Sequence, residues 1–172
     1  MKKLTTILAL ALCLSVLVGC ASTQTSETLT APEGTTEELL NKIYENVTVD
    51  LPLMTLPVDL SDEFAVSTYL GMDGADAVKE ASVSESMIGA QAYSVVLARL
   101  NDAAQAETVA QTMFDNIDTR KWICVEATEK QAVVCGDLVL FVMLGPEYGV
   151  TCDQIVDAFT TVCGGTVGTV LK

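Results

Sequence analysis

The 172-residue chain contains no histidine. This absence excludes Ser-His-Asp and Cys-His nucleophilic centres, histidine-based zinc sites and the most common general base. A Cys-x-x-Cys motif and a glycine-rich loop that opens a helix are also missing, which argues against a thioredoxin-like redox centre and a phosphate-binding loop. Enzymatic chemistry would have to use carboxylates, thiols, Lys or Tyr. The sequence singles out no catalytic residue and implies no cofactor.

Basic residues are scarce, since nine Lys and Arg stand against 23 Asp and Glu, a net charge of −14. A polyanion cannot neutralise phosphates, so nucleic acid is not an expected partner. Asp73 and Asp76 lack the alternating oxygen ligands that an EF-hand arranges over about twelve residues, and no metal site is predicted. We interpret the acidity as the solvated surface of an exported protein.

The N-terminus has the layout of a secretory signal, because Lys2 and Lys3 precede an apolar run over residues 4–18. A membrane-spanning helix needs roughly twenty apolar residues, so this run is short for a permanent span. Its end, Leu17-Val18-Gly19-Cys20, resembles the lipobox of bacterial lipoproteins. The resemblance implies cleavage between Gly19 and Cys20 and a diacylated Cys20. An ordinary signal peptide with an incidental Cys20 is the alternative.

Three regions follow from this interpretation: a signal peptide (1–19), a lipidated cysteine with a flexible Ser/Thr-rich tether (20–36), and one domain (37–172). Two acyl chains anchor a protein stably, so we expect it at the cell membrane, facing outside the cytoplasm. Cleavage removes two lysines and no acid, which leaves a charge of −16. Repulsion from anionic headgroups should hold the domain away from the lipid surface.

Caps and apolar periodicity predict helices at 36–47, 62–69, 102–118 and 151–163. Residues 49–60 carry two prolines and are expected to be extended over the body rather than in a central strand. Strands are predicted at 83–89, 93–100, 122–127, 131–135 and 138–144, followed by a frayed tail after residue 163. The expected fold is α+β with two layers. An antiparallel sheet of about five strands would carry the helices 102–118 and 151–163 on one face, plus an N-terminal helix.

Four cysteines remain after the signal and Cys20 are set aside. A hairpin with its tip at 129–130 would place Cys124 opposite Cys135, so a disulfide between them is possible in an exported protein. Cys152 and Cys163 would lie about 16 Å apart on one helix and cannot bond to each other. Reduced thiols buried as small apolar side chains are the alternative. A reversible Cys124–Cys135 bond would suit a thiol sensor.

Two groups of charged residues are weak site candidates. Arg120 and Lys121 should complement the dipole at the end of the 102–118 helix, with a small-anion site as the alternative. Paired carboxylates would be needed for glycosidase-like chemistry, but no spacing selects two of them. The candidates are Glu85, Glu107, Asp115, Asp118, Glu126, Asp153 and Asp157.

The order of these elements resembles a family of small lipoproteins, mostly from Gram-positive anaerobes, that carries a domain of unknown function. The resemblance covers about residues 37–163 and depends on Tyr69-Leu-Gly-Met-Asp73, the Gly136-Asp137 hairpin and Asp153-Gln-Ile-Val-Asp-Ala-Phe159. It implies a lipoprotein and no particular activity. We therefore expect a non-enzymatic module that binds another envelope protein or an extracellular ligand. The alternative is a carboxylate-dependent envelope hydrolase.

Overall fold

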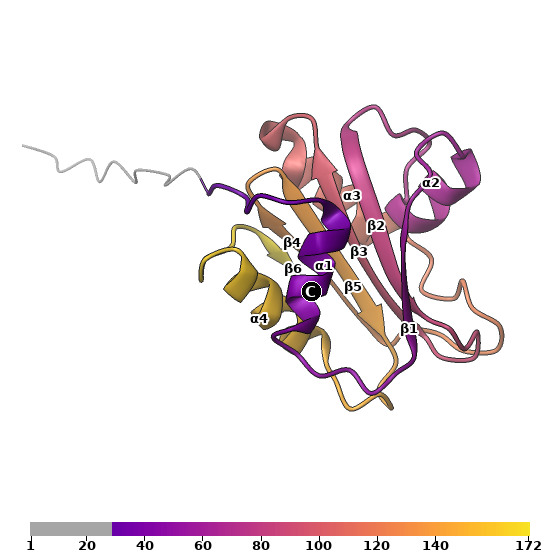
Figure 1. The fold of residues 1–172 in the computed structure, drawn as a ribbon. Coiled ribbons are helices and arrows are strands. Elements are labelled where there is room, and N and C mark those ends of the chain that lie inside the picture. The colour runs from indigo at the N-terminus through magenta and orange to yellow at the C-terminus, as the bar shows by residue number, and fades with distance from the viewer. Residues whose placement is uncertain (1–28) are drawn as a thin grey trace, which may run out of the picture.

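A computed structural model describes residues 29–172, in which four helices surround one antiparallel sheet (Figure 1). The predicted signal peptide, the cleavage site at Gly19 and Cys20 lie outside the described residues. The sheet has six strands in the order β1-β2-β3-β5-β4-β6. This confirms the α+β class and adds a strand to the five expected. The strands are β1 (Leu53–Pro57), β2 (Val78–Ser86), β3 (Tyr93–Leu100), β4 (Glu129–Cys135), β5 (Leu138–Leu144) and β6 (Val170–Leu171).

Strand β5 lies at the centre of the sheet, between β3 and β4, as its continuous apolar sequence predicts. All seven of its residues are buried, and Phe141 pairs with Val96 of β3 on one side and Ala132 of β4 on the other. The β4–β5 hairpin turns at Gly136, whose φ of 59° favours glycine. The structure therefore confirms the predicted hairpin. It also confirms the strands predicted at 93–100 and 138–144, which are β3 and β5, the two central strands of the sheet.

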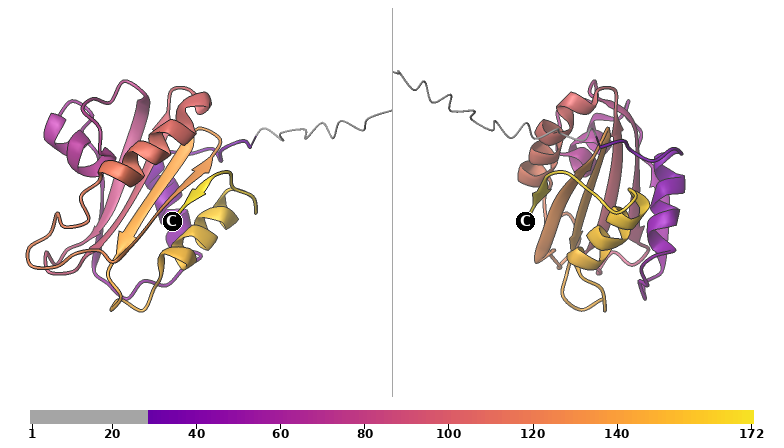
Figure 2. Two further views of the ribbon diagram at one scale, coloured as in Figure 1. Left: turned by 180° about the vertical axis from the view of Figure 1, so that it is seen from behind. Right: turned by 90° about the vertical axis from the view of Figure 1, so that its left-hand side faces the viewer.

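The helices cover both faces of the sheet, so the prediction of two main helices on one face is wrong. Helices α2 (Glu63–Leu70) and α3 (Ala106–Asn116) pack on the face that carries Phe141. Helices α1 (Thr36–Tyr44) and α4 (Cys152–Val162) pack on the opposite face, against Leu140. The side view in Figure 2 shows the resulting three layers. A central strand that is apolar on both faces needs cover on both faces, and this overrides the two-layer expectation.

Helix ends follow the capping signals in the sequence. Thr35 and Glu38 form a capping box at α1, and Thr151 and Gln154 form another at α4. Asp62 caps α2, which ends at Gly71 with a φ of 66°. A short 3-10 turn, η1 (Ala103–Gln105), precedes α3. No helix in the described part of the chain is long and apolar enough to span a bilayer.

Three segments differ from the sequence-based predictions. Strand β2 begins at Val78 rather than 83, with an irregularity between Val78 and Glu80. Residues 122–127 form no strand and belong to a long loop (117–128) between α3 and β4. The predicted frayed tail forms β6, where Val170 pairs with Val133 at the sheet edge. Both errors near β4 arise because strand pairing depends on distant partners, and local sequence does not reveal them.

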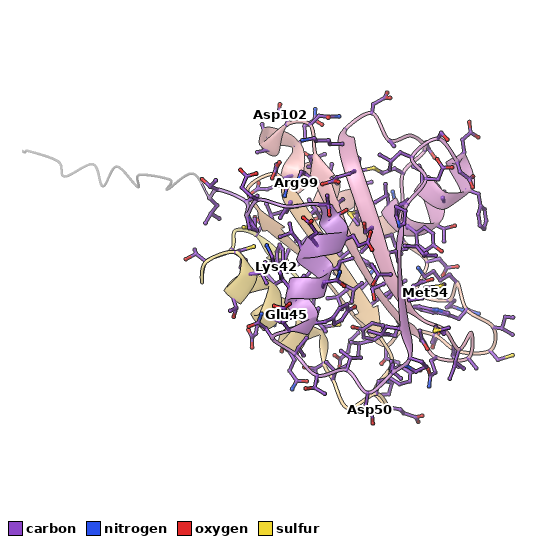
Figure 3. All side chains as sticks on the ribbon, in the orientation of Figure 1. Lys42, Glu45, Asp50, Met54, Arg99 and Asp102 are labelled. Atoms are coloured by element: carbon purple, nitrogen blue, oxygen red, sulfur yellow. The ribbon has the colours of Figure 1, made fainter. Side chains whose placement is uncertain are left out.

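The described chain begins with a docked segment, residues 29–35, that lies against the body. Arg99 of β3 donates from Nη2 to the carbonyls of Pro32 (2.8 Å) and Gly34 (3.1 Å), while its Nη1 binds Asp137 at 2.9 Å. Gly136 makes room for the segment, because a Cβ there would lie 2.6 Å from the Ala31 nitrogen. Figure 3 shows Arg99 close to the start of α1. The prediction of a flexible tether up to residue 36 is therefore wrong for this part.

Replacing Arg99 with Lys should release the docked segment, since one ammonium group cannot reproduce the planar fork of hydrogen bonds. We expect faster hydrogen exchange in residues 29–35 and a loss of about 1–3 kcal/mol in the free energy of unfolding. Arg120→Lys is the matched control, because Arg120 is mostly exposed and lies 3.7 Å from Glu126. That change should stay within about 0.5 kcal/mol. Unchanged exchange in Arg99→Lys would contradict the docking role.

Candidate functional site

The predicted disulfide between Cys124 and Cys135 is absent, and the four described cysteines are free. Cys124 lies in the exposed loop before β4 with a φ of 64°, whereas Cys135 is buried at the end of β4. The pairing fails because residues 122–127 do not form the expected strand, so no hairpin brings the two residues together. Cys135 instead contacts Cys163, a pairing that sequence spacing alone did not suggest.

Nothing in the described residues singles out two of the seven candidate carboxylates as a paired acid site. Most of them bind a nearby donor. Asp118 accepts a hydrogen bond from the Arg120 amide, and Glu107 accepts one from the Thr169 hydroxyl. Hydrogen bonding from Lys172 holds the pKa of Asp153 below its usual range, the opposite of what a general acid needs. In the part of the chain that the structure describes, no three acidic or cysteine side chains gather as a metal site.

Lys121 is the least expected charged residue, because it turns into the body instead of capping α3. Its Nζ lies 2.7 Å from Oε1 of Glu85 and donates to Oγ of Ser94 at 3.1 Å. The ring of Tyr69 lies 4.6 Å away and that of Trp122 lies 5.4 Å away. The cross-strand pairing of Glu85 with Ser94 places both partners on the face that α2 and α3 cover. We call these five residues the Lys121 cluster.

The Lys121 cluster does not have the properties of a Ser-Lys catalytic dyad. Burial lowers the pKa of Lys121, but the neighbouring Glu85 carboxylate favours its charged form. Burial and the same carboxylate raise the pKa of Tyr69. Ser94 is completely buried and Lys121 is paired with Glu85 at 2.7 Å, so neither group is open to a substrate. The cluster therefore ties the long loop to the sheet.

The outer edge of β1 presents unused backbone groups. The Met87 amide donates to the Pro52 carbonyl, and the Val58 amide to the Ala81 carbonyl, so the even-numbered positions of β1 face β2. Leu53 and Thr55 then direct their N–H and C=O groups away from the sheet. Pro57 has no N–H at the next outward position, which keeps this edge short. Sequence reasoning expected an extended segment here and did not identify it as the edge strand.

Apolar side chains border this edge on both faces of the sheet. A groove of about 450 Å³ lies between α1 and β1, lined by Tyr44, Leu51, Leu53 and Thr55 among others. On the other face, Met54 and Leu56 are each 47% exposed. Figure 3 shows Met54 at β1, with Lys42, Glu45 and Asp50 along α1 and the loop that follows it. The edge thus combines free backbone groups with apolar surface on either side.

The surface around the edge strand belongs to a strongly acidic domain. Lys2, Lys3 and Glu27 precede the described residues, which leaves seven basic and 22 acidic side chains within them. Five of the seven cations bind groups of the chain itself: Arg99, Arg120, Lys121, Lys130 and Lys172. Most carboxylates therefore have no cation beside them, and the domain should attract basic partners.

Replacing Lys121 with Met should lower the free energy of unfolding by about 1–3 kcal/mol, because Glu85 loses its partner in a mostly buried position. Adding Glu85→Gln should recover part of this loss, which a double-mutant cycle from urea denaturation can measure. Lys79→Met, at an exposed position on β2, serves as the control. Strictly additive effects of the two substitutions would show that the ion pair is not coupled.

Comparisons with family models, curated proteins and solved structures return no match. The resemblance to small lipoproteins therefore stays a prediction that depends on the residues quoted for it. The function has to be argued from the sequence signals and from the geometry of the described domain.

Proposed function

We propose that the chain is a membrane-anchored lipoprotein, held outside the cytoplasm by acyl chains on Cys20, whose domain binds a partner without catalysis. The partner segment in this proposal is an extended peptide, rich in basic and apolar residues, that adds to the edge of β1. The observation that carries the proposal is the free edge of β1 between the groove beside α1, which is lined by both apolar and polar side chains, and the exposed Met54 and Leu56.

The anchoring half of the proposal is supported by the lipobox residues Leu17 to Cys20 after an apolar run of signal-peptide length. The acidic composition agrees with it, because an acidic domain stays soluble and does not adhere to anionic lipid. Two acyl chains would suffice for stable attachment without a spanning helix.

The binding half is supported by the physics of strand addition. A peptide beside β1 would exchange backbone hydrogen bonds with Leu53 and Thr55. Its alternate side chains would meet the groove beside α1 on one face, and Met54 and Leu56 on the other. The uncompensated carboxylates favour Lys or Arg in that peptide. Peptide addition therefore uses the backbone edge, the apolar surfaces and the charge together.

A carboxylate-dependent hydrolase is the weaker alternative. It needs one acid with a raised pKa within about 5 to 9 Å of an ionised partner. The two carboxyl groups with a resolved shift, Asp59 and Asp153, both have lowered pKa values because of hydrogen bonds from Ser61 and Lys172. No observation in the described domain favours this alternative.

Cys20→Ala should abolish incorporation of a labelled palmitate analogue in cells, because the substitution removes the sulfur that would accept the lipid. Cys13→Ala is the matched control, since Cys13 lies inside the predicted signal and should not affect labelling. Gel detection of the label in the immunoprecipitated chain measures the effect. A wild-type chain without label, or a labelled Cys20→Ala chain, would disprove the anchor.

Selection of a phage-displayed random peptide library on the purified full chain should enrich peptides that alternate apolar residues with Lys or Arg. Thr55→Pro removes one outward N–H without breaking the β1–β2 ladder, and should weaken these peptides about tenfold or more. Thr55→Val keeps the N–H and should bind normally. Equal binding to Thr55→Pro, or no enrichment, would contradict strand addition.

A further inference from the structure

Two thiols that are distant in the sequence meet at one end of the sheet. Cys135 is the last residue of β4 and is completely buried, and Cys163 follows the last residue of α4 and is partly exposed. Both belong to the core between the sheet and helices α1 and α4. The two thiols lie close enough for each to shift the pKa of the other.

The course of α4 explains why these residues meet. At its start, Asp153 accepts a hydrogen bond from Gln131 of β4 at 2.7 Å. From Asp153 to Cys163 the helix advances about 15 Å. Along β4, the four residue steps from Gln131 to Cys135 cover about 13 Å. The two lengths match, so a helix that starts beside Gln131 and runs along β4 ends beside Cys135, where Cys163 interacts with it.

The contact also distinguishes the two thiols chemically. The hydrogen bond from Cys163 lowers the pKa of Cys135 and raises that of Cys163. Cys152 sits at the opposite end of α4, where burial raises its pKa to about 12. Cys124 lies alone on the exposed loop. Only Cys135 and Cys163 are therefore placed, among the described cysteines, to react with each other.

We propose that Cys135 and Cys163 form a disulfide by exchange with a disulfide-bearing oxidant outside the cytoplasm. Cys163, the accessible thiol, passes its proton to the Cys135 thiolate as it attacks the donor disulfide. This forms a mixed disulfide and releases one donor thiolate. Cys135 gives its proton to that thiolate, attacks the Cys163 sulfur and expels the second donor thiolate. Two protein thiols become one disulfide, and the donor disulfide becomes two thiols.

This bond would tie the end of α4 to the end of β4 and enclose residues 136–162. Closing a loop of this length restricts the unfolded chain, and an increase of about 10 °C in Tm is expected for a domain of this size. Gly164 and Gly165 follow Cys163 with φ of 81° and 93°, so the chain beyond the helix can adjust to the new bond.

The test uses the full chain, oxidised with glutathione disulfide, alkylated under denaturing conditions and digested with trypsin and Glu-C. Trypsin alone leaves residues 131–172 in one peptide, whereas Glu-C cuts at Glu147 between the two cysteines. Mass spectrometry should show a Cys135–Cys163 cross-link with Cys152 alkylated. Alkylation of both Cys135 and Cys163 in the oxidised chain, or a different cross-link, would overturn the proposal.

Thermal unfolding provides a second readout with matched variants. The oxidised wild-type chain and the Cys124→Ser chain should each melt about 10 °C above their reduced forms. Cys163→Ser, at a partly exposed position that should tolerate the change, should show no difference between oxidised and reduced samples. An equal shift in Cys163→Ser would show that the stabilisation comes from elsewhere and would overturn the proposal.

Discussion

The whole fold depends on the burial of β5 on both of its faces. Each fully buried Val, Leu or Phe side chain contributes about 1.5–3 kcal/mol relative to an exposed one. Phe141 needs cover from α3 on one face, and Leu140 needs cover from α1 and α4 on the other. Three layers follow from this requirement. It also agrees with the position of β1 and β6 at the edges, because none of their residues is fully buried.

Much of the fold could be predicted because its signals are local. The capping boxes at Thr35 and Thr151, the stop at Gly71 and the hairpin at Gly136 each depend on residues within four positions of one another. The long apolar run of β5 was sufficient to place that strand at the centre. The α+β class follows from these elements together.

The errors concern contacts between distant segments. Strand β6 exists because Val133 is available as a partner, and residues 122–127 lie outside the sheet because Lys121 anchors the loop to Glu85. Nothing in the local sequence distinguishes Lys121 from Arg120, yet one is buried and the other exposed. Arg99 is a single charged residue in the apolar run of β3, which indicates that its side chain has polar partners. The sequence does not show that these partners are the carbonyls of Pro32 and Gly34.

The docking of residues 29–35 limits how far one end of the domain can lie from the bilayer if Cys20 is anchored in lipid. Nine Cα–Cα steps separate Cys20 from Leu29, which at full extension reach about 30 Å. The β4–β5 turn at Gly136, where the segment docks, would then be held within that distance of the bilayer. The loop after α1, at the opposite end of that helix, would project outward (Figure 1). Molecules that approach from outside would first meet this loop and the groove between α1 and β1 that it borders.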